Sequence, residues 1–121
     1  MRRRRASPEA GIHRALHEHL RLRGKPGLVF FHVPNEGKRS ARQGAELKRQ
    51  GMIAGVADWI FLHAAKFFAL EVKADHTRKP TEAQLAFLAA VNEAGGYAAC
   101  THGLDRALAV IEGWGLLRGM S

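Results

Sequence analysis

Apolar positions near the start of the chain follow a helical period. Ile12, Leu16 and Leu20 lie four residues apart, which predicts an amphipathic helix. Ser7 is the expected N-cap of this helix, and Gly24 is the expected stop. The first element is therefore a helix with one apolar stripe.

Three apolar runs come next, at residues 28–33, 56–63 and 67–73, and each is typical of a strand. A short helix is expected between the first two runs, at residues 42–50. The second and third runs are close enough in sequence to favour an antiparallel hairpin. This part of the chain thus predicts helix, strand, short helix and hairpin.

The remaining pattern predicts a second long helix at residues 80–94, a strand at 97–101 and a final helix at 104–112. The helix before this last strand is a crossover of the right length, so the third and fourth strands are expected to lie parallel in a mixed sheet. The sequence therefore predicts an α/β fold. At 121 residues we expect a single domain over residues 1–121, with residues 1–6 as a flexible basic tail.

Charge narrows the class of partner. The formal net charge is +8 and the sequence pI about 10.6, which favours a polyanion such as nucleic acid. A membrane is disfavoured because no stretch approaches the length of an apolar span. The single Cys100 fits a reducing compartment and reads as a buried small residue. No apolar segment follows the arginine run, so we expect a cytoplasmic rather than a secreted protein.

Asp58, Glu71 and Lys73 carry the candidate chemistry. Strand alternation places Glu71 and Lys73 on the face opposite Leu70 and Val72, and Asp58 is expected on the neighbouring strand of the hairpin. Two carboxylates, with the backbone carbonyl of Val72, offer the hard oxygens that Mg²⁺ or Mn²⁺ prefers, and the lysine can stabilise charge on a phosphate. The alternative is a solvent-facing salt bridge.

Glu9 extends this hypothesis to the first helix. At about 100° per residue, Ile12, Leu16 and Leu20 lie within roughly 60° of Glu9, so this acid points along the core-facing stripe. A metal shared with Asp58 would offset the cost of an inward carboxylate. The alternative is that Glu9 complements the helix dipole at the wet end of the helix.

Gln84 lies near the apolar stripe of the second long helix and could contact a phosphate or a water. It also fits a capping box with Thr81, and the two interpretations are evenly balanced. Candidate contacts to the phosphate backbone are basic or polar residues of the segment between the first two strands: Asn35, Lys38, Arg39, Arg42 and Lys48. Their alternative is a solvated basic loop. The seven histidines form no zinc motif; His32 is expected to be structural or exposed.

These motifs together resemble the VRR-Nuc (virus-type replication-repair nuclease) domain of the PD-(D/E)xK nuclease superfamily. The resemblance is carried by residues 34–39, the segment 51–58 ending in Asp58, Glu71-Val72-Lys73 and Gln84, and it covers the chain from Glu9 to about residue 111. Ala57 departs from the superfamily pattern, which has proline before the aspartate, and this puts the rigidity of the backbone there in doubt.

The resemblance implies a restriction-endonuclease-like αβββαβ core with a mixed central sheet flanked by helices. It also implies Mg²⁺ or Mn²⁺ dependence and cleavage of DNA. By position, Asp58 and Glu71 match the metal-binding acids, Lys73 the catalytic lysine, Gln84 the glutamine of the following helix and Glu9 the first-helix glutamate.

The leading hypothesis is a structure-specific endodeoxyribonuclease of bacterial or phage origin that acts in DNA repair. Stand-alone relatives are similar to Holliday junction resolvases and act as homodimers, which implies branched DNA as the partner here. One alternative is a nucleic-acid-binding module without catalysis. Another is a restriction-type endonuclease, which is weaker because no sequence-reading element is evident.

Overall fold

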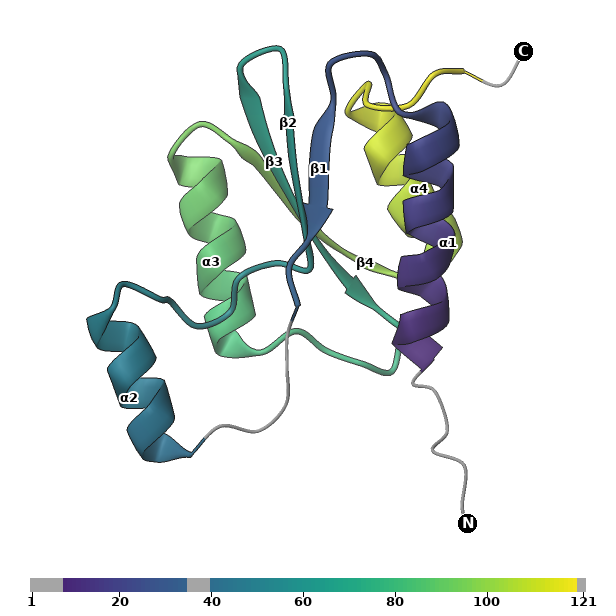
Figure 1. Ribbon diagram of the computed structural model, residues 1–121. Coiled ribbons are helices and arrows are strands. Elements are labelled where there is room, and N and C mark those ends of the chain that lie inside the picture. The colour runs from purple at the N-terminus through teal and green to yellow at the C-terminus, as the bar shows by residue number, and fades with distance from the viewer. Residues whose placement is uncertain (1–7, 35–39, 120–121) are drawn as a thin grey trace.

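The computed structural model describes residues 8–34 and 40–119. Its elements in chain order are α1 (Pro8–Arg23), β1 (Val29–His32), α2 (Ala41–Arg49), β2 (Trp59–His63), β3 (Lys66–Lys73), α3 (Glu82–Glu93), β4 (Tyr97–His102) and α4 (Leu104–Gly113). This is the order that the sequence predicts (Figure 1). The expected tail and the N-cap Ser7 lie outside the described residues.

The strands form one mixed sheet in the order β1-β2-β3-β4. β1 pairs with β2 and β2 with β3 in antiparallel register, and β3 pairs with β4 in parallel. The expected hairpin and the expected parallel pair are both confirmed. Ala64 and Ala65 turn the hairpin with φ values of 51° and 64°, as two-residue hairpin turns require.

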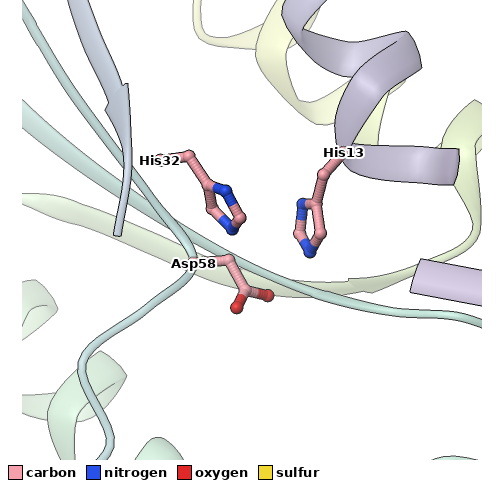
Figure 2. Close-up of side chains that lie close together, drawn as sticks. All are labelled: His13, His32 and Asp58. Carbon is pink, nitrogen blue, oxygen red and sulfur yellow. The ribbon is translucent and has the colours of Figure 1, made fainter. Parts of the chain in front are cut away.

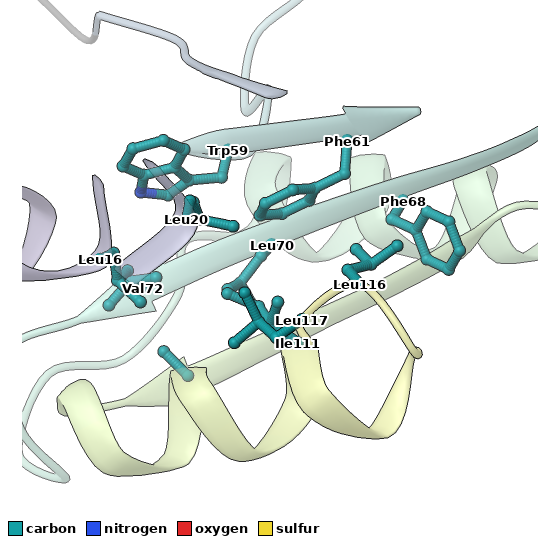
Figure 3. Close-up of a cluster of buried hydrophobic side chains, with 11 residues drawn as sticks. Leu16, Leu20, Trp59, Phe61, Phe68, Leu70, Val72, Ile111, Leu116 and Leu117 are labelled. Carbon is teal, nitrogen blue, oxygen red and sulfur yellow. The ribbon is translucent and has the colours of Figure 1, made fainter. Parts of the chain in front are cut away.

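Helices cover both faces of this sheet (Figure 1). On one face, Phe68, Leu70 and Val72 of β3 pack in the larger core cluster with apolar residues of α1 and α4 (Figure 3). On the other face, Ala69 packs in a smaller cluster that includes Leu88 of α3. The predicted core face is confirmed, and the second face is buried as well. This α/β arrangement is consistent with a restriction-endonuclease-like fold.

One strand boundary differs from expectation. The run at 56–63 was expected to be a strand throughout, whereas β2 begins at Trp59, so Asp58 lies immediately before the strand. The reason is Gly55, which turns the chain with φ 82° and lies so near α3 that an added Cβ would be 2.3 Å from the Ala83 backbone. The chain from Gly55 to Asp58 therefore follows the start of α3 before it joins the sheet.

α2 stands apart from the rest of the chain in Figure 1, and none of its residues is buried. Ser40 and Gln43 form a complete capping box at its start, so local hydrogen bonds rather than core packing stabilise it. Within the described ranges, no helix combines the length and the apolar character needed to cross a membrane.

Candidate active site

The side chain of Asp58 is held by the backbone of strand β3. Its Oδ2 accepts a hydrogen bond from the backbone N–H of Val72 at 2.8 Å, and the residue is 8% exposed. Because Val72 directly follows Glu71 in β3, this bond holds Asp58, which lies immediately before β2, next to Glu71. The hairpin itself therefore sets the position of Asp58 relative to Glu71.

Glu71 is 3% exposed, and its hydrogen-bond and ion-pair partners among the described residues all contact one carboxylate oxygen. Oε2 lies 3.2 Å from the donating Nε2 of Gln84 and 3.4 Å from Nζ of Lys73. Oε1 is buried and has no hydrogen-bond partner among the described residues. The salt bridge with Lys73 exists, but it is buried rather than solvent-facing. A buried carboxylate oxygen without a donor is costly, so Oε1 is placed for a proton or a cation.

Burial also changes the charge state of this carboxyl group. It raises the pKa of Glu71 to about 7, and the negative charge of Asp58 adds to the increase, while Lys73 opposes it. Without a cation, the Glu71 carboxyl group is thus held partly protonated near neutral pH. A divalent ion between two such carboxylates would favour the ionised form of both.

Gln84 takes part in the site and caps its own helix. The Thr81 hydroxyl accepts from the backbone N–H of Gln84 at 3.1 Å, and Oε1 of Gln84 accepts from the backbone N–H of Thr81 at 2.8 Å. The Nε2 group remains free to donate to Glu71. The two interpretations of Gln84 hold together because a side-chain amide has both an acceptor and a donor.

A cavity of about 430 Å³ opens over these groups. Its lining residues are Glu9, Ala10, His13, Arg14, His32, Asp58, Glu71, Lys73 and Gln84. The structure thus brings together all five side chains that the sequence proposes for chemistry. Glu9 is half-buried in the first turn of α1 and reaches the cavity from there, as its helical phase predicts.

Two histidines flank Asp58, and sequence reasoning missed them (Figure 2). The rings of His13 in α1 and His32 in β1 stack with centroids 4.2 Å apart. One nitrogen of each ring and a carboxylate oxygen of Asp58 all lie within 4.8 Å of one another. The available signal was helical phase, since His13 is four residues after Glu9 and shares its helix face. His32 offered no such signal because it comes from another element.

Trp59 fixes the ring of His13. Its Nε1 donates to Nδ1 of His13 at 2.9 Å. Burial lowers the pKa of His13, an effect that the charge of Asp58 partly offsets. His13 is therefore favoured as a neutral ring whose Nδ1 serves as an acceptor.

The two candidate phosphate contacts that the structure describes lie away from this cavity. Arg42 and Lys48 are exposed on α2. The other three candidates, Asn35, Lys38 and Arg39, lie outside the described residues. The structure thus places a basic helix beside the body of the chain, joined to the site by the segment that passes Gly55.

Two solved structures share this architecture. One, titled "VRR_NUC domain protein", superposes with a TM-score of 0.75 at 22% sequence identity, covering 92% of this chain and 90% of that chain. The chain has the fold of a VRR-Nuc domain. A second structure, titled "VRR_NUC domain", gives a TM-score of 0.60 at 18% identity over 88% of this chain and 97% of that one. No protein-family model and no curated protein matches the sequence.

Packing within this fold explains how Ala57 can stand where the superfamily pattern has a proline. This residue is fully buried and packs in the cluster beneath α3, so tertiary contacts hold the backbone before Asp58 without a proline. Chemically, the cavity combines two buried acids, a lysine and an amide donor. Such a set can bind a hard cation and orient a phosphate.

Proposed function

We propose that the chain is a metal-dependent endodeoxyribonuclease that hydrolyses phosphodiester bonds in branched DNA. The observation that carries this proposal is the buried Oε1 of Glu71, which has no hydrogen-bond partner among the described residues and belongs to an acid beside Asp58. A binding module would gain nothing from buried carboxylates that repel a phosphate.

These residues fit Mg²⁺ or Mn²⁺ by the chemistry of their donors. Asp58 and Glu71 would hold the ion, with the backbone carbonyl of Val72 and Glu9 as further oxygen ligands. When bound, the ion would lower the pKa of a water molecule and offset negative charge on the phosphate. An oxygen-rich set of this kind suits hard ions better than soft ones.

The chain's own groups would orient the reactants. The ammonium of Lys73 lies 3.4 Å from Glu71, where it can donate hydrogen bonds to a water or to a phosphate oxygen that gains charge. Gln84, at the start of α3, donates a hydrogen bond to Oε2 of Glu71, so Oε1 is the oxygen that would bind a ligand. Each group comes from rigid secondary structure, as accurate positioning requires.

DNA would be held by phosphate contacts away from the acids. Arg42 and Lys48 are exposed for this role. Asn35, Lys38 and Arg39, which lie outside the described residues, are proposed for it from the sequence alone. Branched DNA presents two similar strands to be cut. A homodimer, as in Holliday junction resolvases, would place one site at each strand.

The test is a cleavage assay on a labelled four-way junction, a flap and a linear duplex, each with Mg²⁺, Mn²⁺ or EDTA. The proposal expects metal-dependent cutting of a branched substrate in preference to the duplex. Folded protein that binds these substrates but cuts none of them with either metal would be a binding module instead. Sedimentation of the protein with and without a junction measures the oligomeric state.

A further inference from the structure

A second cavity adjoins the candidate active site. It has a volume of about 460 Å³ and lies between α1 and the edge strand β1. His13, Arg14 and His32 line both cavities. Trp59, which also lines this second cavity, directly follows Asp58 in the chain. A ligand that occupies it is therefore next to the acids.

The walls of this α1–β1 cavity are flat rings. His32 stacks on His13 with centroids 4.2 Å apart and on Trp59 with centroids 5.0 Å apart and an interplanar angle of 20°. His17 and Phe30 add a second pair of rings, 6.1 Å apart. The hydrogen bond between Trp59 and His13 keeps the rings behind His32 in place. His32 itself is exposed, so it offers a supported planar surface to a ligand.

The charge of the α1–β1 cavity suits a planar ligand that carries an anion. Among the described residues, its lining includes the guanidinium of Arg14, two histidines of α1 and no Asp or Glu. Arg14 is exposed and lies at the boundary with the active-site cavity. Aromatic and guanidinium groups are what proteins use to hold unstacked bases beside a phosphate backbone.

A metal site is the competing use of His13, His32 and Asp58, whose potential ligand atoms lie close together. The Trp59 hydrogen bond argues against it. An indole N–H only donates, so Nδ1 of His13 must accept and the proton of the neutral ring is on Nε2. Nε2 then has no lone pair for a cation, and Nδ1 is already engaged. These rings are better suited to stacking than to coordination.

We propose that the α1–β1 cavity binds one unpaired nucleobase of the DNA strand whose phosphate lies at the active site. This deepens the proposed function, on which it rests for the identity of the ligand as DNA. An unpaired base is present in a single-stranded flap but not in a linear duplex, and a fully paired four-way junction offers one only where a base pair opens at the crossover. Capture of that base by His32 would give a physical basis for a preference for branched substrates.

The experiment is an abasic scan of a flap, with affinity measured by fluorescence anisotropy in EDTA so that no cleavage occurs. One position among the first unpaired nucleotides should weaken binding roughly 5- to 150-fold when its base is removed, the range expected for one base–aromatic stack. His32→Ala should bind the intact flap with the weaker affinity and lose the difference between base and abasic site. His32→Phe, which keeps a flat ring, should retain it.

His63→Ala is the matched control, because His63 lies at the other end of β2 from Trp59. It should bind like the unaltered chain. Equal affinity for intact and abasic flaps at every position would overturn the inference, as would a preference that survives in folded His32→Ala. If that variant fails to fold, the abasic scan on the unaltered chain and on His32→Phe still decides.

The scan separates this inference from the proposed function. A chain that cuts branched DNA with Mg²⁺ but shows no position-specific loss would keep the nuclease and lose the base-binding cavity. If removing the base at one position weakens binding but the chain never cuts DNA, the base-binding cavity stands and the nuclease proposal fails.

Discussion

The side-chain amide of Gln84 joins the start of α3 to Glu71. Its Nε2 donates to Oε2 of Glu71 at 3.2 Å while its Oε1 accepts from the backbone of Thr81 at 2.8 Å. One side chain thus stabilises the helix terminus and orients the buried acid. The two roles can be separated by substitution.

Gln84→Glu should keep the helix cap and impair the site. The new carboxylate can still accept from Thr81, but it no longer donates to Oε2 of Glu71 and places a further negative charge beside it, so Glu71 is displaced and metal-dependent cleavage should fall. Gln84→Ala should lose the cap as well, which lowers the free energy of unfolding by about 1 kcal/mol. Urea unfolding and metal-dependent cleavage measure the two effects.

Gln43→Ala is the control for the cap, because Gln43 completes the same motif on the exposed helix α2. Gln43→Ala should lower the free energy of unfolding by a comparable amount without lowering the affinity for Mg²⁺. If Gln84→Glu bound and used Mg²⁺ as well as the unaltered chain, Gln84 would be a cap and nothing more.

Removal of the central acid or the lysine should abolish chemistry and spare binding. Glu71→Ala and Lys73→Ala are each expected to reduce single-turnover cleavage at least about 100-fold, the usual cost of losing a group that stabilises developing charge. Junction affinity should change little, because the exposed cations of α2 remain. Lys66→Ala, at the opposite end of the same strand, should cut normally. Substantial cleavage by Lys73→Ala would remove the lysine from the mechanism.

The pH dependence of stability should report Glu71 directly. Its pKa is raised to about 7 in the folded chain against a reference value of 4.5. The folded state therefore binds the proton more tightly, and this contribution is fully present below about pH 4.5 and is lost as the pH rises to about 7. At about 1.4 kcal/mol per pKa unit, the loss is at most about 3 kcal/mol.

The measurement is urea unfolding in EDTA at several pH values, for the unaltered chain and for Glu71→Gln. The variant should lack this part of the pH dependence, since its amide does not titrate. Identical pH profiles for the two proteins would show that Glu71 has an ordinary pKa. Added Mn²⁺ should stabilise the unaltered chain above pH 7 and affect the variant less.

Substitutions at Gly55 and Gly51 together test how closely α3 packs against the chain at Gly55. Both have positive φ, 82° and 97°, but only a Cβ at Gly55 would meet the Ala83 backbone, at 2.3 Å. Gly51→Ala should cost about 1 kcal/mol for its φ alone. Gly55→Ala should cost roughly 1–3 kcal/mol more and displace Gln84 from Glu71. Equal costs in thermal unfolding would mean that α3 moves freely to accommodate the methyl group.

The hairpin turn offers a change that should stabilise the chain without reaching the site. Ala64 and Ala65 hold left-handed φ values of 51° and 64°, which disfavour a residue with a Cβ. Asn-Gly suits both positions, so Ala64→Asn with Ala65→Gly should raise the free energy of unfolding by about 1 kcal/mol. Cleavage should be unchanged. A lower melting temperature would mean that the turn is not under strain.

Local patterns were enough to predict the elements and the acids, because strand alternation and helical phase act within a few residues. Glu9 was placed at the site by phase alone, and Asp58 with Glu71 by the hairpin. The start of β2 was missed because it depends on the contact of Gly55 with α3, which is distant in sequence. His32 was missed for the same reason, since its neighbours His13 and Trp59 come from other elements.

The hairpin that carries both acids also holds a conflict between folding and charge. Asp58 and Glu71 come together through contacts that are short-range in sequence, so little loop-closure entropy opposes their meeting. The hairpin of β2 and β3 therefore forms readily even though it brings together two acids that repel each other and lose their hydration. The surrounding helices must overcome this local frustration, and a sequence selected for stability alone would have placed apolar residues there.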